Sequence, residues 1–136
     1  IRLFWATGKD NYEASTCKIR DFGTAVVEPY FENVPELMTA ADIVICRAGA
    51  STISELIQLE KPSILIPYDF VGQKENADVL EYVNGAKIFT NETVEKAIDE
   101  ALSIVRQASM LEFMSENVKS LKKGNSAEII VSEMGL

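Results

Sequence analysis

Short apolar runs alternate with longer amphipathic stretches along the chain. The runs are rich in β-branched residues and end at small residues or proline, which is typical of strands covered on both faces of a sheet. We expect strands at Arg2–Ala6, Thr24–Glu28, Ile43–Cys46, Ser63–Ile66 and Ala86–Phe89. We expect helices at Tyr12–Lys18, Val34–Ala41, Ser51–Leu59, Gln73–Val83, Val94–Ala108, Met110–Leu121 and Ala127–Glu133. This alternation predicts an α/β fold with a Rossmann-like, doubly wound parallel sheet.

Ligands of such folds bind at the carboxyl ends of the strands. The loops expected there are Thr7–Asn11, Pro29–Asn33, Arg47–Ser51 and Pro67–Gln73. In the third, an apolar run stops at a small-residue turn and a Ser/Thr-rich helix start follows, with an acid in its first turn. Backbone N–H groups and the helix dipole at such a start attract a diphosphate. The chain has neither G-x-G-x-x-G nor G-x-x-x-x-G-K-[ST], so an ordinary dinucleotide or P-loop site is not expected.

Composition narrows the function classes. At 136 residues and 47% hydrophobic, with no segment that resembles a linker, residues 1–136 are expected to form a single domain. The net charge of −8 and the scattered Lys and Arg argue against nucleic-acid binding. No apolar run approaches the roughly 18 residues of a membrane-spanning helix.

Metal and redox chemistry find little support in the sequence. The absence of histidine excludes His-based catalysis and most zinc sites, so we expect neither a metal nor a cofactor. Cys17 and Cys46 lie on different elements without C-x-x-C spacing, so two reduced thiols are expected.

Three segments together resemble the C-terminal domain of the MurG family. They are Cys46–Glu55 (CRAGASTISE), Lys61–Pro67 (KPSILIP), and Gln73 with the pair Asn76-Ala77. The resemblance covers nearly the whole chain, and its motifs are specific only in combination. It implies a GT-B enzyme of two Rossmann-like domains that transfers N-acetylglucosamine from UDP-N-acetylglucosamine to lipid I, giving lipid II in peptidoglycan synthesis. Such a transferase is inverting and is peripheral on the cytoplasmic face of the bacterial membrane.

The resemblance also divides the enzyme. Residues 1–136 would be the donor-nucleotide-binding domain, without the N-terminal acceptor domain and the Gly-Gly-Ser start of its own domain. Because the chain begins without Met and enters a strand at once, we expect a piece of a longer protein. No catalytic residue is expected within it, and the isolated chain is expected to be inactive. The absence of an Asp-x-Asp pair fits a metal-independent route.

The implied donor-binding residues are Phe31, Arg47, Gly49, Ala50, Ser51, Thr52, Ile53, Ser54, Glu55 and Gln73. The backbone at Phe31 would read the uracil edge, and Glu55 would accept hydrogen bonds from both ribose hydroxyls. Ser51 and Thr52 would donate to the diphosphate, while Gly49 would keep Cβ atoms out of its path.

Two implied contacts concern side chains that also have structural roles. Gln73 would bond sugar hydroxyls, and the alternative is that it lies in the solvated first turn of a helix. Where the family has His-Gln, this chain has Gly72-Gln73, so the contact from the preceding side chain is lost. Arg47 would brace its loop or balance phosphate charge, and the alternative is that it only pairs with a nearby acid.

The site also has an explanation without ligand. The spacing Thr52-x-x-Glu55 fits a capping box, which would stabilise the helix start by itself. Two other functions stay open: a related GT-B transferase of dolichol-linked sugar or glycolipid synthesis, and a non-catalytic nucleotide-binding module.

Overall fold

A computed structural model of the chain describes residues 1–21, 23–69, 72–124 and 131–135. It divides into two compact units, Ile1–Leu37 and Met38–Leu136. Each unit is a small α/β structure with parallel strands, and each is described by itself.

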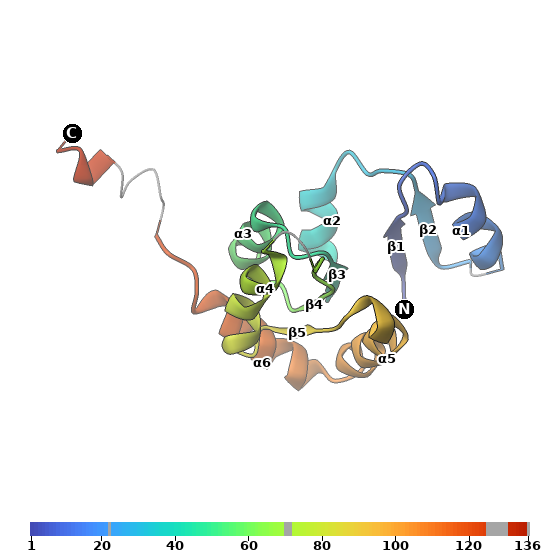
Figure 1. The fold of residues 1–136 in the computed structure, drawn as a ribbon. Coiled ribbons are helices and arrows are strands. Elements are labelled where there is room, and N and C mark those ends of the chain that lie inside the picture. The colour runs from blue at the N-terminus through green and yellow to red at the C-terminus, as the bar shows by residue number, and fades with distance from the viewer. Residues whose placement is uncertain (22, 70–71, 125–130, 136) are drawn as a thin grey trace. The chain divides into compact units, whose positions relative to one another are not determined.

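The first unit holds a pair of parallel strands. Its elements are β1 (Leu3–Ala6), α1 (Tyr12–Ile19), β2 (Ala25–Glu28) and the start of α2 (Val34–Ala40), with β1, α1 and β2 drawn in blue in Figure 1. Leu3 lies opposite Ala25, and Ala6 lies opposite Glu28. Beyond the strand ends, Gly8 N donates to Pro29 O at 3.0 Å. A backbone hydrogen bond thereby links the loop that follows β1 to the loop that follows β2.

The second unit is built on three parallel strands in the order β3-β4-β5. Its elements are the end of α2, β3 (Val44–Cys46), α3 (Ala50–Gln58), β4 (Ser63–Leu65), α4 (Gln73–Tyr82), β5 (Ala86–Ile88), the 3₁₀ helix η1 (Asn91–Thr93), α5 (Val94–Val105) and α6 (Ala108–Lys119). Val44 lies opposite Ser63, which lies opposite Ala86. Since all three strands run the same way, the loops after them meet at one edge of the sheet.

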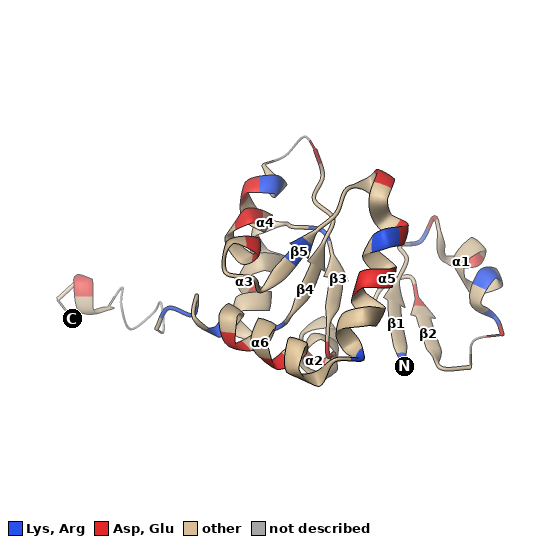
Figure 2. Cartoon of the chain, turned by 90° about the horizontal axis from the view of Figure 1, so that it is seen from below, with Lys and Arg blue, Asp and Glu red and all other residues tan. Residues whose placement is uncertain are grey.

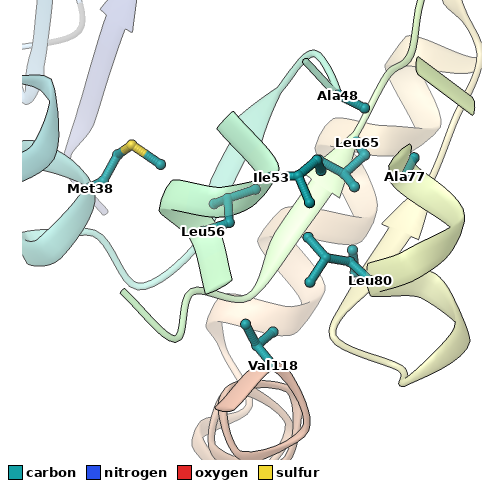
Figure 3. Close-up of a cluster of buried hydrophobic side chains, with 9 residues drawn as sticks. Met38, Ala48, Ile53, Leu56, Leu65, Ala77, Leu80 and Val118 are labelled. Carbon is teal, nitrogen blue, oxygen red and sulfur yellow. The ribbon is translucent and has the colours of Figure 1, made fainter. Parts of the chain in front are cut away.

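Helices cover both faces of this sheet. The central strand β4 is fully buried, and its side chains alternate between two apolar clusters. Leu65 belongs to a cluster with residues of α3, α4 and α6, among them Ile53, Leu80 and Val118 (Figure 3). On the other face, Ile64 packs with residues of α5 and α6. A strand buried on both faces is expected to be largely apolar, and β4 is so except for Ser63, which is polar and also fully buried.

The sequence predicted these elements well. The α/β class with parallel strands is confirmed, and every expected strand is present within a residue or two. Helix α6 begins at Ala108, two residues before the expected Met110, because Gln107 takes an extended backbone and its carbonyl accepts from Met110 N and Leu111 N. The expected helix Ala127–Glu133 falls largely outside the described residues, and the expectation of a single domain stays a prediction.

The lengths and hydropathies of the helices bear on whether any of them could span a membrane. Among the residues that the structure describes, no helix is both long enough and apolar enough to cross a bilayer.

Candidate functional site

The turn from β3 into α3 leaves a helix start open. Gly49 is the N-cap residue, with φ −64° and ψ 148°, and the first bond of the helix runs from Ile53 N to Gly49 O at 3.0 Å. Within the described chain no side chain caps this end, so the N–H groups of Ala50, Ser51 and Thr52 keep their donors unused. Three such donors at the positive end of a helix dipole suit an anion.

The expected capping box is wrong. It required Thr52 as the N-cap residue, but α3 begins two residues earlier, at Ala50. Extended backbone at Gly49 lets the helix start there, and Ala50 has the highest helix propensity of any residue type. Thr52 is therefore the third residue of the helix and Glu55 the sixth, too far along to reach the N-cap.

Glu55 has no structural partner in the described part of the chain. Its side chain is exposed and makes neither a hydrogen bond nor an ion pair there. The charge of Glu55 acts on Cys46, the last residue of β3. The pKa of the Cys46 thiol is raised to about 12, mainly by burial and to a smaller extent by the Glu55 carboxylate. The Glu55 carboxylate therefore lies near the carboxyl end of β3, on the side where ligands of this fold class bind.

Two side chains of α4 hold the peptide groups of Ala48, a residue with 0% exposure. Ala48 N donates to Gln73 Oε1 at 3.2 Å, and Asn76 Nδ2 donates to Ala48 O at 3.1 Å. Gln73 Oε1 also accepts from Tyr68 N at 3.1 Å. The oxygen of Gln73 is thus occupied, whereas its NH2 group donates to none of the described residues.

The glycine before Gln73 has a backbone reason. Gly72 is the N-cap residue of α4 with φ 65°, a left-handed conformation that disfavours side chains with a Cβ. The substitution of glycine for the family's histidine at this position is thus consistent with the local turn.

Arg47 braces the edge of the sheet. Its Nη1 donates to Ile66 O at 2.9 Å and to Asn91 Oδ1 at 2.8 Å. Its guanidinium carbon lies 4.1 Å from the centroid of the Tyr68 ring, a cation–π contact. The side chain therefore ties together the segments that follow β3, β4 and β5.

Other candidates on α3 differ in what they can offer. Ser51 is exposed and Thr52 half-buried, and neither hydroxyl bonds a described residue. Ser54 Oγ donates to Ala50 O at 3.1 Å. Ile53 lies in the core and its N–H is bonded to Gly49 O, so it presents no free polar group.

Phe31 belongs to the first unit, whereas the nine other candidates belong to the second. Its ring meets that of Phe4 edge-on, with centroids 6.4 Å apart and planes at 71°. Its peptide N–H and C=O have no hydrogen-bond partner among the described residues. Backbone reading of a base edge needs both of these groups free.

Three residues of the arrangement were missed by sequence reasoning: Tyr68, Asn76 and Asn91. Asn91 comes shortly after β5, so the rule that singled out the loops after the other strands would have found it too. Asn76 was part of the family resemblance but carried no assigned contact. Tyr68 gave no separate signal.

Comparison with known proteins finds one family. Residues 1–131 match the glycosyltransferase family 28 C-terminal domain. A relative from Fusobacterium nucleatum subsp. nucleatum is 41% identical to this chain over 138 residues. It is named UDP-N-acetylglucosamine–N-acetylmuramyl-(pentapeptide) pyrophosphoryl-undecaprenol N-acetylglucosamine transferase. The alignment covers 100% of this chain and 39% of the relative. Relatives of the same name from Porphyromonas gingivalis and Acetivibrio thermocellus are 35% and 34% identical over 98% and 94% of this chain, each matched over 37% of its length.

A solved structure shares the fold. The crystal structure of MurG from Acinetobacter baumannii superposes with a TM-score of 0.83 at 24% identity, over 97% of this chain and 40% of that protein. The chain thus spans about two fifths of the length of the proteins that it resembles.

Proposed function

The chain belongs to the glycosyltransferase family 28 C-terminal domain family, and from this premise we propose that it is the donor-nucleotide-binding domain, residues 1–136, of an N-acetylglucosaminyltransferase of peptidoglycan synthesis. The donor is UDP-N-acetylglucosamine, the acceptor lipid I and the product lipid II. The names of the relatives at 34–41% identity support this substrate pair. The acceptor site lies outside this chain, and the enzyme works as a peripheral protein on the cytoplasmic face of the membrane.

The open start of α3 carries the proposal. Its three free N–H groups would bind the diphosphate, and Gly49 would let the phosphates approach. The fold does not need glycine at that position, because φ is −64° and a Cβ there would meet only Thr52 Oγ1, at 3.7 Å. Apart from its modest advantage over alanine as an N-cap residue, Gly49 has no reason in the fold to be glycine, and close approach of a ligand would supply one.

Within the second unit, the remaining contacts would extend the donor along the same edge of the β3-β4-β5 sheet. Glu55 has no internal partner, so its carboxylate is free to accept from both ribose hydroxyls. The free NH2 group of Gln73 would donate to a sugar oxygen, and Arg47 would contribute positive charge near the phosphates. The free peptide of Phe31 would pair with the uracil edge.

The reaction is a direct displacement at the anomeric carbon. The acceptor hydroxyl oxygen forms a bond to that carbon while the bond to the β-phosphate oxygen breaks. The hydroxyl proton passes to a base that residues 1–136 do not supply, and UDP leaves with the electron pair. Negative charge therefore grows on the phosphate as the bond breaks. Donors fixed before the reaction, such as the N–H groups of α3, stabilise that charge without reorganisation.

Titration by NMR tests the proposal. UDP should shift the backbone signals of Phe31 and of the α3 start, Ser51–Glu55, more than ADP does at equal concentration. Equal shifts with the two nucleotides would mean that only the phosphates are recognised, and no shifts with either would refute donor binding by this chain.

A further inference from the structure

Among the described residues, the guanidinium of Arg47 is oriented by neutral groups alone. Its hydrogen-bond acceptors are a backbone carbonyl, that of Ile66, and the side-chain amide oxygen of Asn91, and Tyr68 covers one face. An aspartate at the position of Asn91 would offer an oxygen with the same geometry. The amide fixes the direction of the guanidinium but leaves its charge uncompensated.

Among the described residues, four other cationic side chains form ion pairs, whereas Lys61, like Arg47, donates to neutral oxygen atoms. Each ion pair in the described part of the chain is made by a lysine: Lys74 with Asp78, Lys87 with Glu100, Lys119 with Glu116 and Lys122 with Glu60. Acidic side chains are spread along α4, α5 and α6 (Figure 2). In a chain of net charge −8 carboxylates are plentiful, yet within the described residues none pairs with Arg47.

The position of this charge matters for an anion. Arg47 stands three residues before Ala50, where α3 begins, so its charge and the positive end of the α3 dipole belong to one turn. Its Nε and Nη2 groups donate to none of the described residues and remain for phosphate oxygens. Asn91 is itself held by a tight local turn, in which Thr90 N donates to Thr93 Oγ1 at 2.9 Å.

We propose that Asn91 is a positioning residue for the donor diphosphate: it orients Arg47 through a hydrogen bond while leaving the guanidinium charge for the ligand. The inference rests on the proposed function, because it assigns Asn91 to the same donor site. On this proposal, the side chain at position 91 must be a neutral hydrogen-bond acceptor. A purely structural brace would work as well, or better, with a carboxylate.

The test compares Asn91→Asp with wild type in calorimetric titrations of this chain with UDP and with uridine. Asn91→Asp should weaken UDP binding about ten-fold, since the new carboxylate pairs with Arg47. Uridine binding should stay unchanged. The melting temperature should stay unchanged or rise slightly. Asn117→Asp on α6, which contributes no residue to the site, controls for the added charge.

A double-mutant cycle identifies the route of the effect. In an Arg47→Met background, Asn91→Asp should cost less than about two-fold in UDP affinity, because the guanidinium that it neutralises is gone. Unchanged UDP affinity in Asn91→Asp would overturn the inference, and so would an equal loss in both backgrounds, which would mean direct repulsion of the ligand. Absence of UDP binding to wild type would instead refute the proposed function, and this inference with it.

Discussion

Glu55 lies three residues beyond Thr52, the last residue of α3 with an unused N–H group. A carboxylate of the first turn stabilises a helix through its dipole or by capping, but the effect fades beyond that turn. Since Glu55 also lacks a partner among the described residues, the fold gains little from it. Its position beside the proposed anion site therefore supports our proposal that it binds a ligand.

Glu55→Gln should therefore affect binding and not stability. Loss of a charge-assisted hydrogen bond costs about 1.5–3 kcal/mol, which is roughly ten- to hundred-fold in UDP affinity. The melting temperature should stay unchanged, as in the matched control Glu112→Gln on α6. A lower melting temperature with unchanged UDP affinity would return Glu55 to a structural role.

Cys46 provides a pH-dependent property at the same strand end. Burial, and then the charge of Glu55, raise its pKa from the ordinary 9.0 to about 12. The unfolded chain releases this proton first, so the contribution of Cys46 to stability is complete below pH 9 and is lost as the pH rises toward 12. Cys46→Ala should flatten the fall in unfolding free energy between those values, followed by denaturant unfolding.

The two thiols should also differ in reactivity at pH 8. Cys17 is exposed, whereas Cys46 is largely covered and stays protonated. A thiol-specific reagent such as Ellman's should modify Cys17 rapidly and Cys46 slowly, with Cys17→Ser removing the fast phase. Equal rates would contradict the covered position of Cys46.

At the scale of elements, two glycines separate packing from binding. A Cβ on Gly85 would lie 2.5 Å from Val118 Cγ2 of α6, where β5 and α6 come close. Gly49, at the start of α3, has no such neighbour. Glycine is therefore needed at Gly85 by the core, and at Gly49, on our proposal, by the ligand.

Gly85→Ala should destabilise the fold by about 1–3 kcal/mol through overpacking while UDP still binds to the folded protein. Gly49→Ala should cost at most about 1 kcal/mol as a poorer N-cap, yet reduce UDP affinity strongly. Thermal unfolding and calorimetric titration of both variants check the crossed pattern. If both substitutions reduced stability, or both reduced UDP affinity, to the same extent, the distinction between the two glycines would be wrong.

The elements themselves were largely predictable from the sequence, because each depends on local pattern. The strand ends at Cys46 and Leu65 follow from the small residues and Pro67 that come next. The capping box failed because a Thr-x-x-Glu spacing does not specify which residue starts the helix, and Gly49-Ala50 offered an earlier start. Contacts such as those of Arg47 with Asn91, 44 residues apart, depend on how the loops after different strands meet, and no local pattern encodes that.

At the scale of the whole molecule, nine of the ten proposed donor-binding residues lie in Met38–Leu136, and Phe31 lies in Ile1–Leu37. The chain spans only about two fifths of its relatives, and no acceptor contact has been proposed within it.

The purified chain should therefore bind UDP but transfer no sugar. An assay with labelled UDP-N-acetylglucosamine and a lipid I analogue should give no product above that of a chain-free blank. Turnover by the chain alone would contradict the placement of the acceptor site outside residues 1–136.

The occupied oxygen of Gln73 limits the chemistry of any sugar atom that it meets. With Oε1 engaged by Ala48 N and Tyr68 N, the side chain has only hydrogen atoms to present. Among donor analogues altered at the contacted hydroxyl, one with an ether oxygen keeps a lone pair there and should retain the interaction, whereas the deoxy analogue should lose it. The protein would therefore require a hydrogen-bond acceptor at that position of the sugar. It would bind a hydroxyl and an ether oxygen there equally well.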